Sequence, residues 1–232
     1  MTAALAPDAA KRLFDAIRVV KGAPLTPGDV VTINAALAPP APPFHDRPGD
    51  PLTYRAALEL IDHEALVLEA YKDSKRIWTW GIGVTDKSGH RVERYQDNPQ
   101  TVEHVLAIYI WLLRNRYIPD VLKAFDGFAL SETQFAAALS FHYNTGAILR
   151  AGWVDRFKAG DIDGARAAFM EWRKPPEIIA RREKERDLFF DGKWSHNQFV
   201  TIYPVSKPSY TPEWRSARQV DISADLARAL AA

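Results

Sequence analysis

Residues 63–85 read HEALVLEAYKDSKRIWTWGIGVT, and a change of hydrophobic period around this stretch decides the fold. Apolar residues of segment 54–69 recur at helical spacing, so we predict one helix there. Residues 77–82 alternate in side-chain type, which is typical of a strand. A polar turn at 72–76 leads into this strand, and a second turn follows at 87–90. The first helix of the main body is therefore expected to be followed by a small sheet.

Helical patterns dominate the rest of the main body. Ser131, with Gln134 three residues later, has the spacing of a capping box. Proline at position 119 is expected to break the helix before it. The helices that we predict cover residues 98–119 (with Asn98 as the cap), Ser131 onward, 161–172 (capped by Asp161) and 176–190 (ended by Gly192). The predicted fold class is α+β, mostly helical with one small antiparallel sheet after the first helix.

Proline-rich and aromatic segments divide the chain. Prolines at the density of residues 38–52 cannot continue a helix and favour an extended linker. Trp194 and Trp214 are expected to anchor the C-terminal residues to the body. The predicted parts are a small N-terminal helical unit at 1–37 (helices at 8–21 and 26–36), the linker at 38–52, a main domain at 53–192 and an extended C-terminal arm at 193–232.

Composition excludes several classes of function. Among 232 residues, 30 Lys and Arg balance 29 Asp and Glu, so no global field favours nucleic acid. Cysteine is absent, which excludes disulfides and thiolate metal sites, and the six histidines share no ligand spacing. No signal peptide or apolar run of membrane-spanning length is visible. We expect a soluble monomer without metal or cofactor, with no nucleic-acid partner and no stable membrane insertion.

Three residues of the opening stretch form a candidate catalytic group. Glu64 borders the apolar stripe of the predicted helix, where desolvation would favour the protonated carboxyl. Asp73 lies in the polar turn, where solvent favours the charged form, and Thr79 follows in the strand. Two carboxyl groups in contrasting environments suit glycoside hydrolysis, with one acid and one base. An Asp in a turn and a Glu at a helix edge are, however, also common without any catalytic role.

Two other patterns suggest different functions. His63-Glu64 begins a zinc-binding H-E-x-x-H motif, but the position of the second histidine is occupied by Val67. Residues 181–186 read RREKER, which is basic enough to suggest nucleic-acid binding. Because acids interleave with the bases, we interpret this run as a salt-bridged, solvated helix face.

The spacing Glu64-x8-Asp73-x5-Thr79 resembles the phage-type lysozymes, the muramidases of glycoside hydrolase family 24. The flanking Ala70-Tyr71-Lys72-Asp73 and Thr79-Trp80-Gly81-Ile82-Gly83 are similar to motifs of that family. Later stretches that resemble it are residues 140–146 (SFHYNTG), 157–161 (FKAGD) and 180–189 (ARREKERDLF). The resemblance covers roughly residues 54–192 and implies a lysozyme-like fold.

The resemblance implies a role for each matching residue. Glu64 would be the general acid, Asp73 the base or the stabiliser of an oxocarbenium-like transition state, and Thr79 the water-positioning hydroxyl. A further set, expected to bind the sugar, is Tyr143, Asn144 and Thr85. A carboxyl separation of about 6.5–9.5 Å would imply inversion of the anomeric centre, and about 5–5.5 Å retention.

The implied substrate is bacterial peptidoglycan, cut at the β-1,4 bond between N-acetylmuramic acid and N-acetylglucosamine. The implied setting is a phage or prophage endolysin that waits in the host cytoplasm until the membrane is opened and then acts on the wall. Val67, Lys75 and Val84 depart from the family pattern around the cleft. Two alternatives stay open: a lytic transglycosylase, and a non-catalytic wall-binding or virion protein that keeps the fold.

Overall fold

The computed structural model describes residues 7–26, 29, 49–195 and 199–232, which fall into two compact units, 1–43 and 44–232. The first unit contains helix α1 (Pro7–Lys21), at the position where the sequence predicts its first helix. Most of the predicted second helix at 26–36 and of the linker at 38–52 lies outside the described residues. The second unit carries the candidate site.

Helix α3 (Tyr54–Asp62) begins at a cap in which Thr53 Oγ1 accepts the Ala56 backbone N–H at 3.1 Å. The prediction of a helix to residue 69 is wrong, because the chain turns after Asp62 and continues as strand β1 (Leu66–Lys72). Apolar residues that recur every third or fourth position fit a helix, but those of 66–72 pair with a neighbouring strand instead. Glu64 therefore lies in the connection between α3 and β1, and not on a helix.

One five-stranded sheet has the order β3-β2-β1-β4-β7. Its central hairpin joins β1 to β2 (Trp78–Ile82), with Tyr71 opposite Thr79, and β3 (Val84–Thr85) extends it. Strand β4 (Phe199–Ile202) lies parallel to β1, and β7 (Arg218–Asp221) pairs antiparallel with β4. A separate two-stranded sheet joins β5 (Val205–Ser206) to β6 (Thr211–Pro212). The sheet is thus larger than the sequence predicts, and one of its pairings is parallel.

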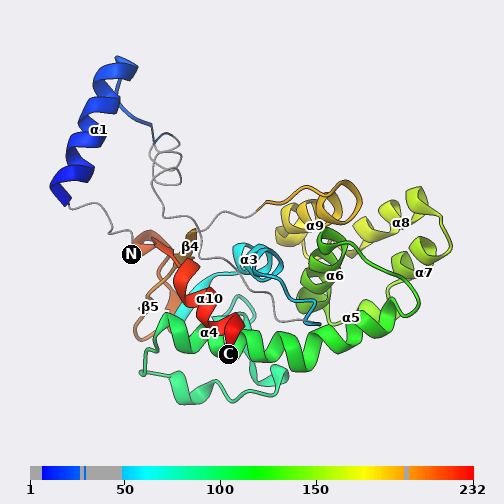
Figure 1. Ribbon diagram of the computed structural model, residues 1–232. Helices are drawn as coiled ribbons and strands as arrows, with labels where there is room; N and C mark the ends of the chain where they lie inside the picture. The colour runs from blue at the N-terminus through cyan, green and yellow to red at the C-terminus, as the bar shows by residue number, and fades with distance from the viewer. Residues whose placement is uncertain (1–6, 27–28, 30–48, 196–198) are drawn as a thin grey trace. The chain divides into compact units, whose positions relative to one another are not determined.

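The C-terminal residues form strands and a helix of the main domain, whereas the sequence predicts an extended arm. They supply β4 and β7 of the main sheet and end in helix α10 (Ser223–Ala231), which packs on α4 and α3 (Figure 1). Ile222 and Leu226 are fully buried there. Arg114 from the helical part donates to the Leu230 carbonyl oxygen at 2.6 Å. This segment is therefore an integral part of the fold.

The helical part surrounds α6. Its helices are α4 (Val102–Leu112), α5 (Ile118–Ala124), α6 (Glu132–Thr145), α7 (Gly152–Lys158), α8 (Ile162–Phe169) and α9 (Ile179–Asp191). The first of these starts at a Thr101 cap and not at Asn98. The predicted break at Pro119 is also wrong, because a π-helical turn links α4 to α5 and proline is tolerated in a first helical turn. The capping box of Ser131 and Gln134 is confirmed.

Buried aromatic rings fix α6 against α7, α8 and α9. The Trp153 ring lies 5.4 Å from Phe141, 4.8 Å from Phe169 and 5.0 Å from Phe189, measured between centroids. All four side chains are at most 2% exposed. Such packing fixes the C-terminal half of α6 against α7, α8 and the last turn of α9, and the site is built at this end of α6.

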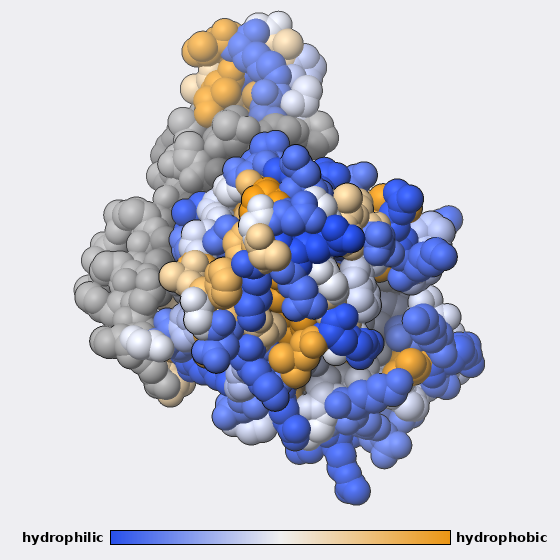
Figure 2. All heavy atoms as spheres, turned by 90° about the vertical axis from the view of Figure 1, so that its right-hand side faces the viewer, coloured by the Kyte–Doolittle hydropathy of each residue, from blue (hydrophilic) through white to orange (hydrophobic). Residues whose placement is uncertain are grey.

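The surface of the helical part is mostly polar on the side that Figure 2 shows. Hydrophilic residues cover most of that face, and apolar side chains form small separate patches. Among the described residues, no helix is long and apolar enough to cross a membrane.

Candidate active site

Asp73 lies in the turn of the β1–β2 hairpin and is held by backbone atoms close to it in sequence. Its Oδ1 accepts the backbone N–H groups of Lys75 and Ile77, each at 2.8 Å. Its own N–H donates to the Ile77 carbonyl oxygen at 3.0 Å. No hydrogen bond from the described residues reaches Oδ2. One carboxylate oxygen thus fixes the turn, and the other is available to a ligand.

Thr79 lies on β2, opposite Tyr71 of β1. It is 3% exposed, and its hydroxyl donates to the Ile77 carbonyl oxygen at 3.2 Å. Burial raises the pKa of Tyr71, and the charges of Glu64 and Asp73 raise it further. The buried Tyr71 thus lies directly across the hairpin from Thr79.

Glu64 is positioned by elements distant in sequence. Its Oε1 accepts a hydrogen bond from Arg181 of α9, and the two side chains form an ion pair. A Cβ added at Gly83 would lie 3.1 Å from Glu64 Oε2 and 3.6 Å from Tyr143 Cε1. The sequence places Glu64 at the border of an apolar stripe, and it does not predict the guanidinium group that holds its carboxylate. The glycine leaves room for the other oxygen.

The basic run at 181–186 is buried on one face, which corrects the prediction of a solvated helix face. Arg182 and Glu185 are fully buried, whereas Glu183 and Lys184 are exposed. Arg181 Nε donates to Glu185 Oε1 at 2.9 Å, and Arg182 is ion-paired with Glu185 Oε2. The predicted salt bridges are present, but they form a buried network. The alternation of acids and bases in the sequence fits a buried network and a surface network equally well.

Burial alone would lower the pKa of Arg181, but the carboxylates of Glu64 and Glu185 outweigh it, so that its pKa is raised. Ser140 of α6 joins the same network, donating to Glu185 Oε1 at 2.5 Å. Arg181 is therefore a fixed cation that connects Glu64 to the helical part.

The residues predicted to bind sugar differ in how accessible they are. The Tyr143 hydroxyl donates to the Ile82 carbonyl oxygen, and its ring lies 4.8 Å from that of Tyr117, so this side chain braces β2 against α6. Asn144 is exposed, and its Oδ1 accepts from Arg182 Nη2 at 2.7 Å. Thr85 lies on β3, opposite Thr79, and lines neither of the two cavities of the site.

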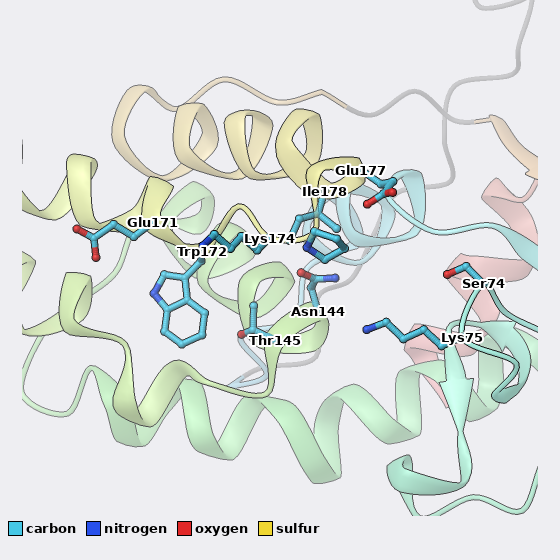
Figure 3. A pocket seen from close by; sticks show the side chains of 10 residues that line it. Ser74, Lys75, Asn144, Thr145, Glu171, Trp172, Lys174, Glu177 and Ile178 are labelled. Carbon is cyan, nitrogen blue, oxygen red and sulfur yellow. The ribbon is translucent and has the colours of Figure 1, made fainter.

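A cavity of about 710 Å³ lies between the β1–β2 turn and α6. Ser74 and Lys75 line it from the hairpin, and Lys75 extends from the turn toward Asn144 (Figure 3). The opposite wall comprises Asn144, Thr145, Glu171, Trp172, Lys174, Pro175, Glu177 and Ile178. Sequence reasoning predicted Asn144 and noted Lys75 as a departure from the family pattern, but it missed most of this wall.

A second cavity, of about 400 Å³, lies on the Glu64 side. One wall is the α3–β1 connection with His63, Glu64 and Ala65, and the other comes from the C-terminal segment. Glu64 itself lines this second cavity, whereas the two residues that follow Asp73 line the first. Among the described residues, no cluster of three or more His, Asp or Glu side chains could hold a metal ion.

Comparison with known proteins agrees with this fold. The model of the phage lysozyme family matches residues 61–185. The endolysin from Escherichia coli O157:H7 phage FAHEc1 is 25% identical, with a TM-score of 0.55 over 62% of this chain and 96% of that one. A mutant of P22 lysozyme is 26% identical, with a TM-score of 0.50 over 60% of this chain and 97% of that one. No curated protein matches the chain. Because the family model covers more than half of the sequence and includes Glu64, Asp73 and Thr79, the chain belongs to the phage lysozyme family.

Proposed function

We propose that this protein is a muramidase, which hydrolyses the β-1,4 bond between N-acetylmuramic acid and N-acetylglucosamine. Its family makes it a glycosidase that acts on peptidoglycan. One observation carries the finer assignment: a guanidinium group holds the Glu64 carboxylate, whereas backbone amides hold Asp73 in the turn of the hairpin whose second strand carries Thr79. One cavity is lined by Glu64 and another by the two residues that follow Asp73, and two cavities of this kind suit the binding of a polymer.

In the proposed reaction, Glu64 donates a proton to the glycosidic oxygen while its bond to the anomeric carbon breaks. Asp73 either accepts a proton from the attacking water or stabilises the positive charge that develops on the sugar. Thr79 orients the water by accepting a hydrogen bond from it. The water's hydroxyl ends on the anomeric carbon, so that each cleavage consumes one water molecule.

Two further residues serve as positioning residues for Glu64. Arg181 holds Oε1 in one orientation, and the missing side chain of Gly83 leaves space for Oε2. We assign Asn144 to sugar binding, because its side chain lines the larger cavity and its amide nitrogen can donate while Arg182 fixes its oxygen. Tyr143 braces β2 and has no direct role in this proposal.

The proposed biological role is host lysis. The similarity to a phage endolysin supports it. In this setting the monomeric protein accumulates in the host cytoplasm and reaches the wall once the membrane has been opened.

Mass spectrometry of digested peptidoglycan tests the proposal, with Glu64→Gln as the matched inactive variant. We expect muropeptides that end in reducing N-acetylmuramic acid from the wild type and none from the variant. Products lighter by one water, the 1,6-anhydro form, would instead make the protein a lytic transglycosylase. An absence of products from the folded wild type would favour the non-catalytic wall-binding alternative.

A further inference from the structure

We propose that the C-terminal segment 199–232 builds an additional saccharide-binding subsite beside Glu64, on the leaving-group side of the cleaved bond. The inference rests on the proposed function, because it assumes that Glu64 protonates a glycosidic oxygen. The segment lies outside the part of the chain that the family model matches, which ends at residue 185. The subsite is therefore an addition of this chain to the family's cleft.

The sheet fixes this segment next to the catalytic acid. Strand β4 pairs with β1, placing Ile202 opposite Leu66, two residues after Glu64. The backbone N–H of Tyr203 then donates to the Leu66 carbonyl oxygen at 3.1 Å. A cavity of about 400 Å³ results, with Glu64 on one wall and Thr201, Tyr203, Trp214 and Gln219 on the other. Because backbone hydrogen bonds hold both walls, the cavity is built into the fold.

An exposed tryptophan borders the cavity. Trp214 is 64% exposed, contrary to the prediction that it anchors the segment, and its ring meets Tyr203 edge-on with centroids 4.9 Å apart. The preceding residue is fixed by a 2.9 Å hydrogen bond from the Glu213 N–H to the Pro204 carbonyl oxygen. A large indole held in solvent beside a catalytic acid presents a flat apolar face, against which a sugar ring can pack.

The polar groups of this wall are available to a ligand. Thr201 and Gln219 face each other across the β4–β7 pair and both line the cavity. Neither side chain has a hydrogen-bond partner among the described residues. A hydroxyl and a carboxamide can bind sugar hydroxyls and an N-acetyl group, and a few polar groups of this kind on an apolar wall are typical of small-molecule sites.

The charges favour a neutral saccharide over an acidic stem peptide. The two acidic residues that line the cavity are Asp62 and Glu64. Asp62 is paired with Lys184, and Glu64 is paired with Arg181. A peptide carboxylate would meet these acids and no unpaired base in the lining. Because the proposed acid, Glu64, lies beside the leaving oxygen, the saccharide on its side of the bond is the leaving group.

The test uses the full chain with Trp214→Ala, and Trp111→Ala as the matched control, because Trp111 is a half-exposed tryptophan on α4 outside both cavities. Glycan strands freed of their stem peptides are the probe, because the sugar on the leaving-group side of the cleaved bond is then the neutral N-acetylglucosamine. We expect kcat/KM to fall roughly three- to tenfold for Trp214→Ala, the range of one aromatic contact, and to stay unchanged in the control. Trp214→Phe, which keeps a flat ring, should recover most of the activity. Thermal melting checks that each variant is folded.

Each outcome separates this inference from the proposed function. If Trp214→Ala cleaves the peptide-free strands as fast as the wild type does, the subsite is overturned and the muramidase assignment stays intact. A loss confined to strands that carry stem peptides would overturn the saccharide assignment in favour of a peptide. If the wild type does not cleave, the proposed function fails. In that case, binding of the same strands is measured by quenching of tryptophan fluorescence. Quenching that is present in Trp111→Ala and absent in Trp214→Ala would still support binding at this wall. A lack of quenching in Trp111→Ala would overturn the subsite.

Discussion

The two carboxylates proposed to be catalytic are held in opposite ways. Asp73 is fixed by amides within four residues of it, inside one hairpin turn. Glu64 is fixed by Arg181, 117 residues later in the sequence, and by the absence of a side chain at Gly83. The Asp73 side of the cleft is therefore set by local structure, whereas the Glu64 side depends on the packing of the whole domain. Perturbations at a distance should act on Glu64 first.

The largest effect on stability should come from Arg181→Met. The substitution leaves Glu64 without its cation and removes one of two arginines from the buried Glu185. Loss of one partner from such a network costs about 3–5 kcal/mol of unfolding free energy. Urea unfolding measures this loss. Lys184→Met on the same helix, an exposed residue, should change stability by less than about 0.5 kcal/mol, and equal losses in the two variants would contradict a buried network.

A second effect should appear as a dependence of stability on pH. Burial, with the positive charges of Arg181 and Lys184, lowers the pKa of His63 from 6.5 to about 4, although Glu185 and Glu59 oppose the shift. Between these values the unfolded chain binds a proton that the folded chain does not. The free energy of unfolding therefore keeps its full value above pH 6.5. As the pH falls toward 4, it decreases by up to about 3 kcal/mol.

The matched variant for this measurement is His63→Gln, because a glutamine has no charge to gain. The difference in unfolding free energy between wild type and variant should narrow or reverse as the pH falls from 7 to 4. A difference that is constant over this range would show that His63 titrates normally in the folded protein.

A smaller effect is expected from Gly83→Ala. Gly83 has φ +67°, a conformation that costs other residues about 1–2 kcal/mol, and the new methyl group would lie 3.1 Å from Glu64 Oε2. We expect kcat to fall at least tenfold because the acid must move. Gly127→Ala, also at positive φ but in open space, should show a similar strain and full activity. Equal activity of the two variants would mean that the acid does not depend on the space at Gly83.

The smallest effect should be that of Tyr143→Phe. It removes the hydroxyl that donates to Ile82 and nothing that faces the larger cavity, so about 1 kcal/mol of stability should be lost. Activity on peptidoglycan should stay within twofold, whereas Asn144→Ala should raise KM. A large loss of activity in Tyr143→Phe with normal stability would return this residue to the sugar-binding set.

The same local and long-range division explains what the sequence could predict. The hairpin turn, the capping box of Ser131 and the helix stop at Gly192 depend on neighbouring residues, and the structure has them where the pattern places them. The end of α3 was missed because the apolar positions of 66–72 fit a helical period as well as a strand. The pairing of β4 with β1 and the burial of Arg182 depend on residues far apart in the chain, which no local pattern records.

The central claim is that the two differently held carboxylates act as one hydrolytic pair. The most direct test is the turnover of purified peptidoglycan in oxygen-18 water by wild type, Glu64→Gln and Asp73→Asn. We predict that the wild type places one labelled oxygen on each reducing N-acetylmuramic acid, and that each folded variant loses at least about a hundredfold in rate. Unlabelled products from the wild type, or a variant that keeps its full rate, would contradict the account.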